Sequence, residues 1–116
     1  MNSENFIDLV KIHVKNVAIK NTIEVLKQPP GRRVPPNERT RSNWYNALAA
    51  DEVEHVNSVV STAVHEALFG LLAVLDGART IDDVGGRFEL TYVSDKRVLL
   101  NDPIEIGLIE LLNASN

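Results

Sequence analysis

The sequence predicts a mainly helical α+β fold with three N-terminal helices, a β-hairpin and one C-terminal helix. Before residue 76, apolar residues recur every three or four positions over most of the chain, which is typical of helices. At 88–92 they alternate with polar residues, as in a strand, and a helix-capping signature follows at 102–105. The chain has 116 residues, 44% of them apolar, so we expect a single domain spanning 1–116.

The first helix is expected at 5–27, where apolar residues form two stripes on different sides. One stripe consists of Phe6, Val10, Val14 and Val17, and the other of Ile12, Ile19, Ile23 and Leu26. Two stripes indicate that the helix is covered from two directions. Either it lies between other helices of the same chain, or one stripe is a surface for a dimer or partner, since monomers rarely expose large apolar patches.

A proline- and arginine-rich segment at about 28–41 interrupts the helical pattern. It contains four prolines and Gly31. Proline has no backbone N–H, and it disfavours helical geometry in the residue before it. We therefore expect an extended surface loop, and loops of this length in compact domains are often functional or mobile.

Two more helices are expected after this loop. The shorter, at about 43–49, would begin at the N-cap Ser42. Its inner side would carry Trp44, Tyr45 and Leu48. The main helix would begin at Asp51, because Glu54 three residues later completes a capping box, and it would end before Gly77. Its C-terminal half is apolar nearly all round and is expected at the centre of the core.

The hairpin and the last helix complete the expected fold. The strands would lie at 87–93 and 97–100, joined by a turn at 94–96. The last helix would extend to about 113. Asp102 would cap it, Pro103 suits its first turn, and Glu105 completes the capping signature.

Charge is sorted along the chain. Residues 27–41 carry five basic side chains and one acidic one, a net charge of +4, whereas 51–116 carry four basic and twelve acidic ones, a net charge of −8. The basic residues considered for binding are Arg32, Arg33, Arg39 and Arg41. Their guanidinium groups suit carboxylates and phosphates, which indicates an anion-binding arm. Alternatively, the segment folds over the acidic half of the chain or is simply solvated.

The acidic half has two interpretations as well. Its carboxylates either cap helices and keep the surface soluble, or they steer the protein toward a basic partner. Asp76 is unusual because a carboxylate at a helix C-terminus faces the negative end of the helix dipole. We expect Arg79 or the N-terminus of another helix to compensate it, and both residues are candidates for binding.

Candidate catalytic residues are His55, His65 and Glu66 on the main helix. In a small enzyme, one histidine would act as a general base while Arg32, Arg33 or Arg39 held an anionic substrate. This hypothesis requires a histidine and at least two arginines to converge on one pocket. The spacing of the histidines matches no metal-binding motif and the chain has no cysteine, so we expect no metal site and no cofactor.

The sequence composition also indicates where the protein is located and whether it binds nucleic acid. The first five residues lack the basic start of a signal peptide. The longest apolar run, around Ala67–Leu75, is shorter than the ~20 residues of a membrane span, so we expect a cytoplasmic protein without a membrane role. Nucleic-acid binding is disfavoured because the net charge is −4 and aromatic residues make up only 5% of the chain.

Three motifs resemble a family of small bacterial proteins of unknown function, over roughly residues 40–113. They are Trp44-Tyr45-x-x-Leu48, Leu68-Phe69-Gly70-x-Leu72-x-Val74-Leu75-Asp76-Gly77-x-Arg79, and Leu99-Leu100-Asn101-Asp102-Pro103. The resemblance implies a bacterial single-domain protein and supplies no activity or site.

Taken together, these patterns favour a non-catalytic protein-interaction module. It would form a homodimer through the first helix, or bind a basic partner through its acidic surface in an immunity- or antitoxin-like role. The alternative is the small enzyme described above, with a histidine base and an arginine clamp.

Overall fold

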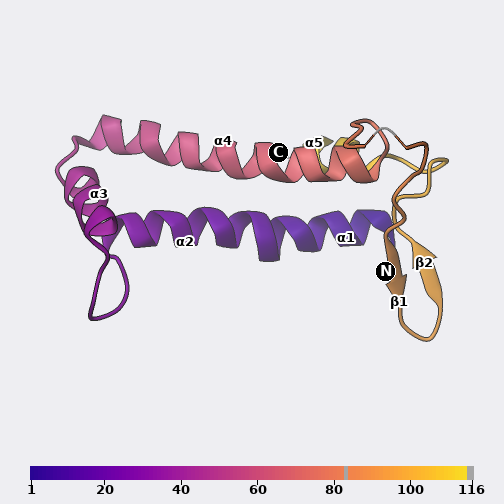
Figure 1. Ribbon diagram of the computed structural model, residues 1–116, viewed down its shortest axis with the longest axis horizontal. Helices are drawn as coiled ribbons and strands as arrows, with labels where there is room; N and C mark the ends of the chain where they lie inside the picture. Colours follow the sequence, from indigo (N-terminus) through magenta and orange to yellow (C-terminus); the bar gives the residue numbers. More distant parts are fainter. Residues whose placement is uncertain (83, 115–116) are drawn as a thin grey trace. The chain divides into compact units, whose positions relative to one another are not determined.

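The computed structural model describes residues 1–82 and 84–114 (Figure 1). Its elements are α1 (Ser3–Val10), the π-helical turn η1 (Lys11–Lys15), α2 (Asn16–Lys27), α3 (Pro36–Asn46), α4 (Ala50–Leu75), β1 (Thr91–Val93), β2 (Arg97–Leu99) and α5 (Leu108–Ala114). The expected α+β class, mainly helical with one hairpin, is therefore confirmed.

The chain forms two compact units, which we describe separately. The first, here called the mixed unit, combines Met1–Val14 with Glu66–Asn116 and contains the hairpin. The second, the helical unit, is Lys15–His65.

The first helical segment is interrupted by the π-helical turn, which explains its two apolar stripes. The covered residues are Phe6 and Val10 before the turn, and Ile19, Ile23 and Leu26 after it. The exposed residues lie within or next to the turn and are Ile12, Val14 and Val17. A π-turn contains one residue more than an α-turn, so it rotates the following side chains around the axis. Each stripe is therefore covered on only one side of the turn.

The mixed unit has a small apolar core. Ile7 of α1, Leu72 of α4, and Leu108 and Leu112 of α5 are buried together. The C-terminal half of α4 was expected at the centre of the core, but only one of its faces lies there. Leu72 and Ala73 are each 3% exposed, whereas Leu71 is 59% exposed. Fully burying a large aliphatic side chain contributes about 1.5–3 kcal/mol. Partly buried residues, among them Phe6, Leu68 and Leu111, pack against this cluster and add to it.

Helix α4 ends as predicted. Gly77 has a positive φ of 78°, the conformation that favours glycine after a helix. The Ala78 N–H donates to the Ala73 carbonyl at 2.9 Å, and the Gly77 N–H donates to the Val74 carbonyl at 3.1 Å. These two bonds form a Schellman motif, which satisfies carbonyls that the helix itself leaves open.

The carboxylate of Asp76 caps α5. Its two oxygens accept from the backbone N–H groups of Leu108 and Ile109, each at 3.0 Å. The expectation that another helix N-terminus compensates this carboxylate is thus confirmed. Arg79 forms no ion pair with Asp76 in the described part of the chain. Its guanidinium instead lies so close to Gly70 that a Cβ added there would be 2.6 Å from Nη1.

The predicted start of the last helix is wrong. Residues 102–105 form a turn, in which the Asp102 carboxylate accepts from the Ile104 N–H at 3.1 Å, and α5 begins only at Leu108. The Asp102 side chain thus forms an Asx-turn and caps no helix. The N-terminus of α5 is capped by Asp76.

The predicted extent of the basic loop is also wrong, because α3 begins at Pro36 and not after Ser42. Proline suits the first helical position, where no intrahelical N–H bond is lost. Arg39 and Arg41 consequently lie on a helix, and only residues 28–35 remain as a loop. Ser42, expected as an N-cap, is buried in the middle of α3.

The predicted cap of the main helix differs as well. Helix α4 begins at Ala50, and the Glu52 carboxylate accepts from the Ala49 N–H at 2.9 Å. This contact is one half of a capping box, and it lies two residues before the Asp51 and Glu54 pair that the sequence suggested.

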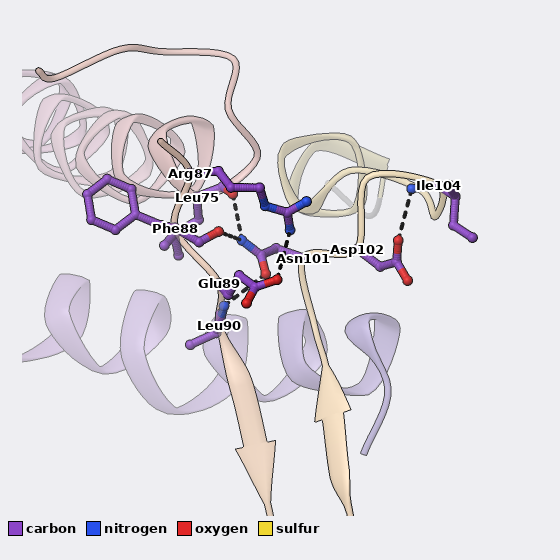
Figure 2. Close-up of polar contacts among 8 residues, drawn as sticks. All are labelled: Leu75, Arg87, Phe88, Glu89, Leu90, Asn101, Asp102 and Ile104. Carbon is purple, nitrogen blue, oxygen red and sulfur yellow. Dashed lines mark hydrogen bonds and ion pairs between the residues drawn. The ribbon is translucent and has the colours of Figure 1, made fainter. Parts of the chain in front are cut away.

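The hairpin is antiparallel with Tyr92 opposite Val98, and its predicted turn at 94–96 is confirmed. Asn101 ties it to α4 (Figure 2). Its Nδ2 donates to the carbonyls of Leu75 at 2.7 Å and Phe88 at 2.8 Å, and its Oδ1 accepts from the Leu90 N–H at 2.8 Å. The buried amide of Asn101 thus provides hydrogen-bond partners for three backbone groups, the carbonyls of Leu75 and Phe88 and the N–H of Leu90.

By length and composition alone, α4 is long and apolar enough to cross a membrane. An 18-residue window of this helix has a mean hydropathy of 1.7. The expectation of no membrane role considered only the longest uninterrupted apolar run, around Ala67–Leu75. That run is shorter than the 18-residue window over which the mean is high. Core helices of soluble proteins reach the same values but are mostly buried, whereas only 11% of this window is buried among the described residues.

Candidate functional site

Helices α2 and α3 line an open cavity of about 280 Å³ in the helical unit. Val25 and Leu26 of α2 provide its apolar part, and Asn21 and Thr22 add polar groups. Glu38 and Arg41 of α3 supply opposite charges at the same cavity. The cavity therefore offers an apolar surface beside a guanidinium group and a carboxylate.

A second, shallower hollow lies along α3. Its lining residues are Pro36, Asn37, Thr40, Arg41 and Trp44. Trp44 is 53% exposed, although the sequence analysis placed it on the inner side of its helix. Arg41 lines both hollows, so its charge lies between two apolar areas. We call the residues lining the two hollows the α3 surface.

Hydrogen bonds from other residues of α3 fix the helix to α2 and α4 and leave the α3 surface exposed. The Tyr45 side chain is 2% exposed, and its hydroxyl donates to the Asn57 amide oxygen on α4 at 2.8 Å. Ser42 and Asn46 donate to the Lys27 carbonyl at 3.3 and 2.9 Å, which caps the end of α2. Residues three and four apart share a helix face, so Ser42, Tyr45 and Asn46 lie together, while Arg41 and Trp44 remain exposed beside them.

The predicted binding arginines are all exposed. Arg32 and Arg33 lie in the loop after α2, and Arg39 and Arg41 lie on α3. Among the described residues, none of these four guanidinium groups forms an ion pair with an acidic side chain. Only Arg41 lines the two hollows, so the structure brings a single predicted arginine to this site.

The predicted catalytic residues lie elsewhere on α4. His55 and Glu66 are exposed. His65 is half-buried, and its Nδ1 lies 3.1 Å from Nζ of Lys15. Neither hollow of the α3 surface is lined by a histidine. The convergence of a histidine with two arginines, which the enzyme hypothesis requires, is therefore not found at these hollows.

The remaining binding candidates have other positions. Asp76 is half-buried and bonded to the start of α5, whereas Arg79 is exposed in the loop that follows α4. Asp82 and Asp83 follow Asp76 closely in the sequence, but their spacing does not match an EF-hand loop, and Asp83 lies outside the described residues. Within 1–82 and 84–114, no group of three or more metal-ligating side chains is placed to hold a metal ion.

Sequence reasoning missed the α3 surface because it ended the proline-rich loop too late. The available signal was Pro36 followed by Glu38, since proline and an acidic residue are both favoured in the first turn of a helix. With α3 beginning at Pro36, Asn37, Thr40, Arg41 and Trp44 fall at three- and four-residue spacing.

Comparisons of the chain with protein-family models, curated proteins and solved structures find no match. The function is therefore argued from the residues themselves.

Proposed function

We propose that the protein is a non-catalytic interaction module that acts as a homodimer formed through its helical unit. One observation carries this proposal. Among the described residues of this unit, the only buried side chains are Ser42 and Tyr45, whereas Val17 on α2 and Val59 on α4 are 43% and 67% exposed. A unit with so little buried apolar surface gains stability when a second copy covers its exposed valines.

The mass of the protein in solution tests this proposal. Size-exclusion chromatography with light scattering should give about twice the 12.9 kDa of one chain. The double variant Val17→Glu, Val59→Glu should elute as a monomer, because two carboxylates would have to be buried in the interface. Circular dichroism checks that the variant keeps its helices.

Matched controls are Asn16→Glu and Ser58→Glu, which add the same charges at the neighbouring exposed positions. They should leave the dimer intact. A monomeric wild-type protein at all concentrations would contradict the proposal, and so would a protein that enters solution only with detergent.

A further inference from the structure

The α3 surface has an arrangement suited to a particular kind of peptide. Arg41 lies between the cavity at Val25 and Leu26 and the hollow at Trp44. A ligand that contacts all three places needs an anionic group flanked on both sides by apolar groups. Every second residue of an extended segment, or residues one turn apart on a helix, present groups in this order on one face.

We infer that the α3 surface binds an acidic segment of a partner protein, with one carboxylate on Arg41 and apolar side chains in the two hollows. The inference rests on the proposed function as an interaction module, and it names the partner's chemistry. A second copy covers the valines of the proposed dimer, whereas this site takes a different chain.

Charge complementarity favours an acidic occupant. Residues 27–41 have a net charge of +4, and Arg32, Arg33, Arg39 and Arg41 form no ion pair in the part of the chain that the structure describes. A guanidinium group binds a carboxylate through two parallel hydrogen bonds. The other three arginines lie outside the hollows and raise the local positive potential, which speeds the encounter with an acidic segment.

The site also has features that lower the cost of binding. Arg41 and Trp44 project from a helix that Tyr45 and Asn46 hold in place. A preformed helical surface loses less entropy on binding than a flexible loop does. Trp44 offers a large and rigid aromatic contact, the kind of residue that often dominates binding energy.

Glu38 allows the charge of the ligand to be tested. Its half-buried carboxylate lines the same cavity as Arg41 and repels an acidic ligand. Removing its charge should therefore tighten the binding of an acidic peptide, whereas removing the charge of Arg41 should weaken it. A site for a basic or neutral ligand would not show these two opposite effects.

The experiment uses the full chain and a ten-residue peptide in which leucine and glutamate alternate at every second position, separated by serine, so that both lie on one face of an extended segment. Binding is followed by the fluorescence of Trp44, the single tryptophan, and by the anisotropy of a labelled peptide. We expect Arg41→Gln to weaken binding about tenfold and Glu38→Gln to tighten it about threefold. Arg97→Gln, which changes an exposed arginine of β2, should have no effect.

A matched peptide with glutamine in place of glutamate should bind at least about tenfold more weakly. Equal binding of the two peptides, or equal effects of Arg41→Gln and Arg97→Gln, would overturn the inference. Single-stranded RNA that binds more tightly than the acidic peptide would overturn it as well. If Arg41→Gln instead dissociates the dimer, the occupant is a second copy, and the inference of a separate partner is wrong.

The proposed dimer and the proposed peptide site can be tested independently of each other. The Val17→Glu, Val59→Glu variant retains the α3 surface, so it should bind the peptide as tightly as the charge-matched Asn16→Glu, Ser58→Glu control does, whether or not the wild-type protein is dimeric. Loss of binding in this folded variant would contradict a site that belongs to one chain.

Discussion

Asn101 shows how much can depend on one polar side chain. It is 6% exposed, and its amide makes three hydrogen bonds to backbone groups that no strand or helix ladder satisfies. A buried polar group without a partner costs about 1–3 kcal/mol. The junction between α4 and the hairpin therefore depends on an amide that both donates and accepts.

We predict that Asn101→Ala lowers the free energy of unfolding by about 2–4 kcal/mol, because three backbone groups lose their partner. Asn101→Asp should be at least as destabilising, since a carboxylate cannot donate to the two carbonyls. Denaturant unfolding followed by circular dichroism measures both effects. Asn113→Ala, at an exposed position, serves as the control and should change stability by less than about 0.5 kcal/mol.

Asp76 is the second residue with a large local effect. It caps α5, a short helix whose Leu108 and Leu112 lie in the core. At the other end of α5, Lys11 donates from Nζ to the Leu111 carbonyl at 3.2 Å. Opposite charges thus stabilise both ends of one helix dipole.

Replacing Asp76 with alanine should reduce stability by about 1–2 kcal/mol, the usual effect of losing a helix N-cap. Asp76→Asn should lose less, because the amide keeps one oxygen acceptor for the N–H groups. The midpoint of urea unfolding reports the difference. If Asp76→Ala is no more destabilising than Asp8→Ala on exposed α1 surface, the cap contributes nothing.

At the scale of elements, α3 depends on side-chain contacts more than on apolar burial. Ser42 and Tyr45 are its buried residues. The Tyr45 hydroxyl fixes α3 to α4 through Asn57, and Asn46 fixes it to the end of α2. The position of the α3 surface therefore follows from a few hydrogen bonds.

For this element we predict that Tyr45→Phe lowers stability by about 1 kcal/mol, since Asn57 loses a hydrogen-bond donor while the ring keeps its packing. Thermal unfolding measures the change. Tyr92→Phe is the matched control, because the Tyr92 side chain is 43% exposed in the hairpin. Similar losses in the two variants would show that the Tyr45 hydroxyl does not hold α3.

The π-helical turn is the other decisive element. It leaves Ile12, Val14 and Val17 exposed because the covered face changes at this point. π-turns inside α-helices are rare and frequently mark functional sites. The exposure of Val17, on which the proposed dimer depends, thus has a local geometric cause.

At the scale of the whole molecule, the two proposed contacts should respond differently to salt. The dimer buries valines, so its mass should be the same at about 50 and about 500 mM salt. Peptide binding at Arg41 should weaken over the same range, because salt screens charges at an exposed site. A dimer that dissociates in high salt would point to the sorted charges as its cause and contradict an apolar interface.

Local sequence patterns predicted the order of the helices and the hairpin, the hairpin turn and the end of α4, but not the starts of α3, α4 and α5. The Schellman motif at Gly77 and the turn at 94–96 depend on neighbouring residues, so a pattern within a short window determines them. The need of Asp76 for a compensating group was also visible, since it follows from the helix dipole alone.

The remaining features required the tertiary structure. The cap of α5 comes from a residue 32 positions earlier, and Asn101 bonds a carbonyl 26 positions away. No local pattern encodes such partners, because chain folding brings them together. The α3 surface belongs to the same group: α2 and α3 both line its cavity, and only their packing makes the charge of Arg41 adjacent to Val25 and Leu26.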